Sequence, residues 1–113
     1  MAQAGVRVAV ASRTEVDTSS ESDFQRYASG TIHQTAEIIR AQGGTAVGVR
    51  CDLSRAKEIQ SLVETTLGRF GRIDILVSNA GIDCEAPVPD LDVDLLDRCL
   101  AVNVRAPLLL CKY

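Results

Sequence analysis

The stretch that decides the fold reads Ile-Asp-Ile-Leu-Val-Ser-Asn-Ala-Gly and spans Ile73 to Gly81 of the 113-residue chain. Its apolar run is too short for a helix, is rich in branched side chains and ends at the turn-forming residues Asn79 and Gly81. This pattern is typical of a buried parallel strand, here Ile73 to Ser78. Ligands of open α/β sheets bind beyond the carboxyl ends of such strands, so we expect the turn after Ser78 to face a ligand.

Two further β-like runs and three helical patterns surround this strand. The β-like runs are Val6 to Ala11 and Thr45 to Arg50. The helical patterns run from Thr31 to Gly43, from Ser54 to Gly71 and from Asp90 onward. Strands that alternate with helices predict an α/β fold, in which a parallel sheet has helices on both faces. We expect one domain over residues 1–113.

Polar residues mark where these helices begin. Thr31 and Gln34 have the spacing of a capping box, and Ser54 is of the residue type that caps the next helix. The polar stretch from Thr14 to Ser29 has no clear period, which indicates a long surface loop. The second helix carries an apolar stripe made of Ile59, Leu62, Val63, Leu67 and Phe70.

Composition argues against several classes of function. The net charge is -3 and aromatic residues make up 4% of the chain, so nucleic acid would find no basic or stacking platform. No apolar run approaches the roughly 20 residues of a membrane-spanning helix, and the first residues do not resemble a signal peptide. We expect a cytoplasmic protein that binds neither nucleic acid nor a membrane.

The cysteine pattern does not predict a metal site. The chain has four cysteines, without a Cys-x-x-Cys pair, and one histidine, His33, which we expect in solvent. Apolar neighbours favour core thiols in a reducing compartment, and a catalytic thiol is the alternative. The four positions are Cys51, Cys84, Cys99 and Cys111.

An asparagine stands where the last helix should carry an apolar residue. Leu96, Leu100, Asn103 and Pro107 follow one another at steps of four, three and four, on one helical stripe. Pro107 has no amide to donate to the carbonyl of Asn103. Two interpretations stay open: a kinked helix with a half-exposed asparagine, or a carbonyl that holds a functional water.

Four markers, in this order and spacing, resemble the short-chain dehydrogenase/reductase family. They are Val8 to Arg13, Cys51 to Leu53, Asp74 to Gly81 and Val102 to Val104. The resemblance implies a Rossmann-type sheet that binds NAD(H) or NADP(H) and passes hydride between nicotinamide and a carbonyl or alcohol carbon. Strands 2, 3 and 4 of the family would be present, and strand 1 with its Gly-rich turn would be missing.

The resemblance also implies which residues hold the cofactor. Asp52, followed by Leu53, would contact the adenine ring. Asn79, Ala80 and Gly81 would line the cofactor beside the sheet.

A residue just past the first expected strand bears on the choice between NAD(H) and NADP(H). Arg13, preceded by Ser12, stands where NAD-preferring members usually carry an acidic residue. An acid would repel a 2′-phosphate, whereas arginine can bind it. We therefore expect NADP(H) rather than NAD(H), and a solvated arginine at a strand end is the alternative.

Asn103 matches the asparagine of the family's Asn-Ser-Tyr-Lys catalytic set, whose main-chain carbonyl holds a water in the proton relay. The Tyr-x-x-x-Lys pair is missing, and Tyr113 is not its tyrosine. We expect an incomplete copy with little activity alone, which when complete acts as a homodimer or homotetramer on a small carbonyl or alcohol. A non-catalytic dinucleotide-binding or interaction remnant, and an extended-type nucleotide-sugar epimerase or dehydratase, are the alternatives.

Overall fold

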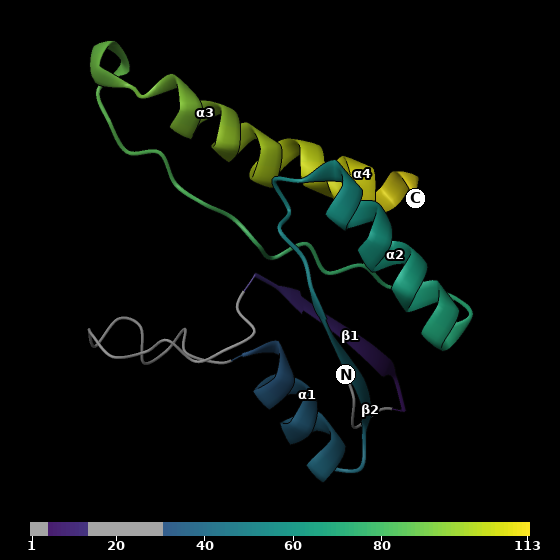
Figure 1. The fold of residues 1–113 in the computed structure, drawn as a ribbon. Helices are drawn as coiled ribbons and strands as arrows, with labels where there is room; N and C mark the ends of the chain where they lie inside the picture. Colours follow the sequence, from purple (N-terminus) through teal and green to yellow (C-terminus); the bar gives the residue numbers. More distant parts are fainter. Residues whose placement is uncertain (1–4, 14–30) are drawn as a thin grey trace. The chain divides into compact units, whose positions relative to one another are not determined.

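The structure is a computed structural model that describes residues 5–13 and 31–113, in two compact units divided between Cys51 and Asp52. The first unit holds strand β1 (Arg7–Ser12), helix α1 (Ile32–Ala41) and strand β2 (Thr45–Arg50) (Figure 1). The second holds helix α2 (Ala56–Phe70), the 3-10 turn η3 (Val88–Asp90), helix α3 (Val93–Leu100), the π-helical turn η4 (Ala101–Arg105) and helix α4 (Ala106–Lys112). The single domain over residues 1–113 stays a prediction. The expected surface loop lies outside the described residues.

The first unit is a β-α-β arrangement that confirms the α/β class. β1 and β2 are parallel, and their register pairs Arg7 with Thr45 and Ser12 with Arg50. Parallel neighbours require a crossover connection. The chain between them contains α1, which packs against both strands (Figure 1). The carboxyl ends of the two strands therefore lie at the same edge of the sheet.

Thr31 begins α1 through the predicted capping box. Its hydroxyl accepts from the Gln34 amide at 3.1 Å, and the Gln34 side chain accepts from the Thr31 amide at 3.1 Å. Ile32 and Ala36 are buried, and His33 is exposed as expected. The backbone of α1 approaches β2 closely at Gly48, where a Cβ would lie 3.1 Å from the Ile32 carbonyl oxygen.

This close approach predicts opposite effects for two glycine substitutions. Gly48→Ala should lower the free energy of unfolding of the first unit by about 1–2 kcal/mol, because α1 must move away from β2. Gly68→Ala, in α2 with no atom within 4 Å of the added Cβ, should raise stability by about 0.5–1 kcal/mol through helix propensity. Urea denaturation with hydrogen exchange resolved by unit measures both. Equal effects of the two substitutions would contradict the packing at Gly48.

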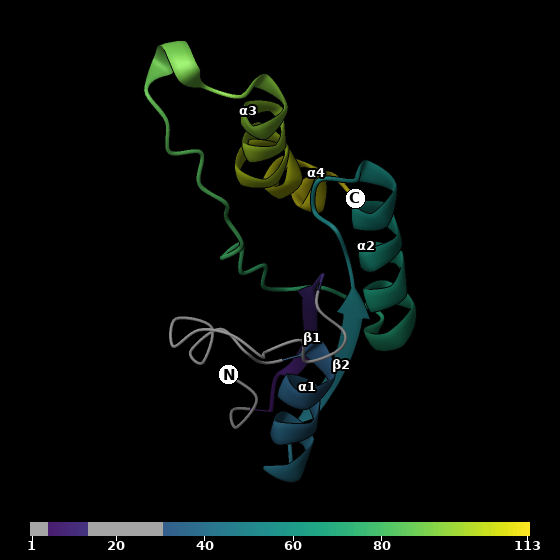
Figure 2. The same ribbon diagram turned by 60° about the vertical axis from the view of Figure 1, so that its left-hand side comes forward.

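In the second unit, α2 and α4 lie side by side (Figures 1 and 2). Ile59, Leu62 and Val63 are buried on α2 as predicted. Leu67 was expected on the same face, but it is exposed. Thr66 is buried instead, where its hydroxyl donates to the Leu62 carbonyl at 2.8 Å. The helix ends at Gly71, whose φ of 79° is a left-handed conformation that glycine adopts without strain.

The predicted strand from Ile73 to Ser78 is not formed. Residues 73–85 belong to neither helix nor strand, and the side chains of Ile75 and Val77 are 59% and 62% exposed. The described sheet contains only β1 and β2, which correspond to the expected strands 2 and 3. A strand needs a partner for its backbone groups, and an apolar sequence alone cannot supply one. Helices on both faces of the sheet remain a prediction.

Residues 73–85 present an extended backbone edge, through which we expect copies of the chain to associate. Val77→Lys should reduce self-association several-fold without loss of helix content, because charge on an open edge opposes strand pairing between chains. Val104→Lys is a matched control, since Val104 is 53% exposed on a helix whose backbone is already paired. Light scattering after size-exclusion chromatography gives the measurement. An equal effect of both substitutions would show that apolar area, rather than the backbone edge, causes association.

Candidate functional site

The side chain of Asn103 holds the segment that follows Gly81. Its Nδ2 donates to the Ile82 carbonyl at 2.8 Å, and its Oδ1 accepts from the Ile82 amide at 3.0 Å. One side chain thus satisfies both backbone groups of one residue, as a neighbouring antiparallel strand would. A Cβ added to Gly81 would lie 3.5 Å from the same Oδ1, so Gly81 also adjoins Asn103.

Asn103 lies at the centre of η4, where the helical ladder widens. The Ala106 amide bonds to the Ala101 carbonyl, five residues back, instead of the usual four. Pro107 follows within the first turn of α4 and has no amide to offer the Asn103 carbonyl. Single π-helical turns occur frequently at functional sites, and an irregular turn with an exposed Asn103 is also what the kinked-helix interpretation expects, so the functional role of Asn103 stays a prediction.

The predicted apolar stripe through Asn103 is wrong, because the buried face lies one position earlier. Leu100 is half exposed and Asn103 is exposed. One residue turns a helix by about 100°, which puts Asn103 at the flank of the buried face. From that flank its amide reaches Ile82. The buried residues of this region are Cys99, Ala101, Val102 and Ala106.

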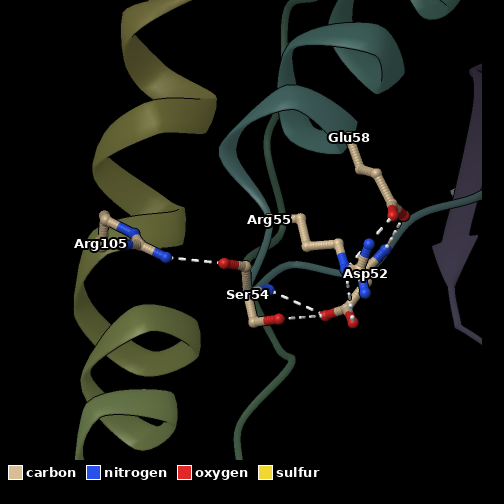
Figure 3. Close-up of polar contacts among 5 residues, drawn as sticks. All are labelled: Asp52, Ser54, Arg55, Glu58 and Arg105. Atoms are coloured by element: carbon tan, nitrogen blue, oxygen red, sulfur yellow. Dashed lines mark hydrogen bonds and ion pairs between the residues drawn. The ribbon is translucent and has the colours of Figure 1, made fainter.

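Aspartate side chains order the backbone where α2 and α3 begin. Asp92 caps α3, since its Oδ1 accepts from the amides of Asp94 at 2.8 Å and Leu95 at 3.3 Å. Asp52 orders the turn before α2: its Oδ1 accepts from the amide of Ser54 at 2.9 Å and from its hydroxyl at 2.7 Å (Figure 3). The prediction that Ser54 caps α2 is wrong, because the N-cap residue is Arg55 and no side chain caps the helix; the Ser54 hydroxyl donates to Asp52.

Glu58 and Arg105 support the Asp52 turn from outside it. The Glu58 carboxylate accepts from the Asp52 amide at 2.8 Å, and Nη2 of Arg105 donates to the Ser54 carbonyl at 2.6 Å (Figure 3). Arg55 lies 3.8 Å from Asp52 and 3.7 Å from Glu58, but its side chain is 71% exposed, so these ion pairs contribute little. Arg105 thus ties the Asp52 turn to the helical region that carries Asn103.

Neither supporting residue was found from the sequence. Glu58 is the third residue of α2, a position from which a glutamate commonly bonds backward to a free amide, and that spacing could have indicated it. Arg105 lies 51 residues from Ser54, and no local pattern indicates that contact.

The remaining predicted site residues lie at three places. Asn79 and Ala80 are exposed in the extended segment, and Leu53 is half-buried in the Asp52 turn. Ser12 ends β1 and Arg13 follows it, exposed, in the separately described first unit. The structure therefore brings Asn103 to Gly81 and joins its helix to the Asp52 turn, and Ser12 and Arg13 belong to the first unit.

The part of the chain that the structure describes holds no cluster of three or more His, Cys, Asp or Glu side chains suited to a metal ion. Within the same residues, no helix has the length and apolar character needed to cross a membrane.

A parallel β-α-β unit that continues into a polar turn and an amphipathic helix is the arrangement of a Rossmann-type nucleotide-binding protein. Comparison with known families agrees, since the model described as short chain dehydrogenase matches residues 23–113. The chain belongs to the short-chain dehydrogenase family. Three of its four sequence markers lie within the matched residues, and the resemblance to that family is thereby confirmed.

Individual relatives match 70% or more of this chain. The chain is 41% identical over 83 residues to the short chain dehydrogenase/reductase dpchG of Colletotrichum higginsianum. The matched stretch covers 73% of this chain and 31% of that protein. It is 38% identical over 80 residues to glucose 1-dehydrogenase 2 of Bacillus subtilis, covering 70% of this chain and 31% of that protein. The chain thus spans about a third of the length of these relatives.

Solved structures show the same fold. A metagenomic short-chain oxidoreductase in complex with NADP matches with a TM-score of 0.77 and 29% identity, over 98% of this chain and 44% of that one. A 3-ketoacyl-ACP reductase from Sinorhizobium meliloti matches with a TM-score of 0.80 and 29% identity, over 98% of this chain and 38% of that one.

The paired hydrogen bonds between Asn103 and Ile82 can be tested by removing them at nearly constant side-chain volume. Asn103→Leu should speed hydrogen exchange of the Ile82 amide by about tenfold, because net hydrogen bonds contribute about 0.5–1.5 kcal/mol each. Asn79→Leu, at an exposed position of the same segment, should leave that exchange rate within about twofold. Exchange followed by NMR gives both rates, and an unchanged Ile82 rate in Asn103→Leu would contradict the role assigned to Asn103.

Proposed function

We propose that this chain forms the cofactor-binding part of an oxidoreductase that transfers hydride between NADP(H) and a carbonyl or alcohol carbon of a small substrate. The observation that carries the proposal is Asn103, which sits in a π-helical turn and holds the segment directly after Gly81. Membership of the short-chain dehydrogenase family supports a nicotinamide cofactor.

The adenosine end would be bound at the carboxyl edge of the sheet. β1 and β2 end together there, since the Cys51 amide donates to the Ser12 carbonyl at 3.0 Å. Arg13 follows immediately and is exposed. A planar guanidinium suits a phosphate at two of its oxygens, so Arg13 would bind the 2′-phosphate that distinguishes NADP(H). The likeness to an oxidoreductase solved with NADP supports the same preference.

The Asp52 turn would receive the adenine ring. Its backbone is held on several sides, by the Asp52 carboxylate, by Glu58 and by Arg105 (Figure 3). A turn held in this way can present Asp52 and Leu53 to a flat ring without first losing conformational freedom.

At the nicotinamide end, Asn79, Ala80 and Gly81 would line the cofactor, which when bound supplies or accepts the hydride. The side-chain amide of Asn103 is engaged by Ile82, so a part in proton transfer would fall to the main-chain carbonyl. Because Pro107 offers that carbonyl no amide, it would hold a water for the proton relay. Asn103 would in this way serve proton transfer through its backbone and position the cofactor-lining segment through its side chain.

The complete protein would act as a homodimer or homotetramer in the cytoplasm, and the chain by itself would have little activity. The low activity is supported by the length of the relatives, of which this chain spans 31%. The test therefore uses a hybrid, in which the chain replaces its matching segment in the metagenomic oxidoreductase to which it is similar.

In that hybrid, Arg13→Ala should raise KM for NADPH by about tenfold or more and leave KM for NADH within about twofold, because a charge-assisted bond to phosphate is lost. Arg7→Ala, at the opposite end of β1, is the matched control and should change neither value. Steady-state kinetics with both cofactors gives the comparison, and equilibrium binding of NADP⁺ follows any variant without turnover. A hybrid that prefers NADH would overturn the cofactor assignment, and one that folds but binds neither cofactor would overturn the proposed function.

A further inference from the structure

The helical turn η4 joins two parts of the candidate site that lie far apart in the chain. The Nη2 atom of Arg105 donates to the Ser54 carbonyl at 2.6 Å, across 51 residues. Two residues earlier, the Asn103 side chain bonds to both backbone groups of Ile82, at 2.8 Å and 3.0 Å. Residues two apart on a helix project from nearly opposite sides. One side chain of η4 therefore holds the Asp52 turn and another holds the segment at Ile82, all within the second unit.

We propose that Arg105 is a positioning residue that couples the two ends of the cofactor site. Ordering of the Asp52 turn, where the adenine ring would bind, passes through Arg105 and η4 to Ile82, which directly follows the residues that would line the nicotinamide. The identity of the ligand rests on the proposed function, whereas the coupling is a property of this chain alone. Binding at either end then favours the ordered form of the other end, because such coupling is reciprocal.

The side chains around the Asp52 turn differ in what they connect. Glu58 accepts from the Asp52 amide, but it belongs to α2, which follows the turn directly. Arg55 precedes α2 in the same stretch, and its side chain is 71% exposed. Arg105 approaches from a separate helical region, on the side of the turn away from Glu58 (Figure 3). Of these three side chains, Arg105 alone belongs to the region that carries Asn103.

The chemistry of the Arg105 contact suits the transmission of a backbone shift. A guanidinium presents its donors in fixed directions on a planar group. A hydrogen bond from a charged donor is stronger than one between neutral groups. The acceptor is the main-chain carbonyl of Ser54, so a displacement of the turn acts on Arg105 without an intervening flexible side chain.

Two backbone amides report on the two ends separately. The Ser54 amide donates to the Asp52 carboxylate at 2.9 Å, and the Ile82 amide donates to Oδ1 of Asn103 at 3.0 Å. Their hydrogen-exchange rates measure how often each contact opens. The amide of Val63, in the middle of α2, serves as the reference for opening of the whole helical region, and both rates are expressed relative to it.

A double-mutant cycle in the 113-residue chain tests the coupling without any ligand. Ser54→Ala removes the hydroxyl bond to Asp52 inside the turn and leaves η4 unaltered. It should speed exchange of the Ile82 amide by about threefold or more, but by less than about 1.5-fold in an Arg105→Met background, where the apolar stem stays and the donor is lost. The proposal is overturned if the Ile82 rate does not respond to Ser54→Ala, or responds equally in both backgrounds.

Two further variants separate the hydrogen bond from the charge of an arginine. Arg55→Met removes a neighbouring guanidinium that forms ion pairs with the same turn, and it should leave the response of Ile82 to Ser54→Ala in place. Arg105→Lys keeps a cationic donor and should retain more of that response than Arg105→Met does. If Arg55→Met abolished the response as fully as Arg105→Met, charge near the turn would be responsible and the role of Arg105 would be refuted.

Adenosine 2′-monophosphate tests the same coupling from the ligand side, because it carries the adenine ring and the 2′-phosphate but no nicotinamide. In the unsubstituted chain it should slow exchange of the Ser54 and Ile82 amides by about threefold, and in Arg105→Met it should slow that of Ser54 alone. Binding that left Ile82 exchange unchanged would count against the coupling. Absence of binding beside an intact mutant cycle would instead contradict the adenine site of the proposed function.

Discussion

The side-chain amide of Asn103 gives Ile82 the two hydrogen bonds that a neighbouring strand would otherwise give it. An extended backbone has a donor and an acceptor at every residue, and each must find a partner or remain in water. Residues 73–85 have no strand beside them in the described sheet, and the segment meets the helical region where the Asn103 amide and the Cys99 thiol bond to Ile82. Gly81, directly before Ile82, is held next to Asn103 by these contacts.

The same helical region also holds the Asp52 turn, through a hydrogen bond from the Arg105 guanidinium to the Ser54 carbonyl. A hydrogen bond from a guanidinium to a carbonyl contributes about 1.5–3 kcal/mol, whereas an exposed ion pair contributes about 0–1 kcal/mol. The bond from Arg105 to Ser54 therefore outweighs the ion pairs of Arg55. Asn103 and Arg105 lie two residues apart, so the π-helical turn serves both contacts.

Predictions from local pattern succeeded where the interacting groups are close in the chain. The capping box of Thr31 and the bounds of β2 from Thr45 to Arg50 are as expected, because neither depends on distant residues for its pattern. The predicted cap at Ser54 was wrong by one position, since α2 begins at Ala56 and Arg55 is its N-cap residue. The stripe through Asn103 was displaced by one position, because several helical faces fit the apolar pattern and packing selects among them.

By itself, the sequence determined the family, the β-α-β order of the first unit and the residue types at the candidate site, because these reside in short motifs and periodicities. Only the tertiary structure decided that Ile73 to Ser78 is extended without being a strand, that Asn103 bonds to Ile82, and that Arg105 bonds to Ser54. Each of these depends on partners distant in the chain. A strand, and a hydrogen bond between distant residues, exist only when folding brings such partners together.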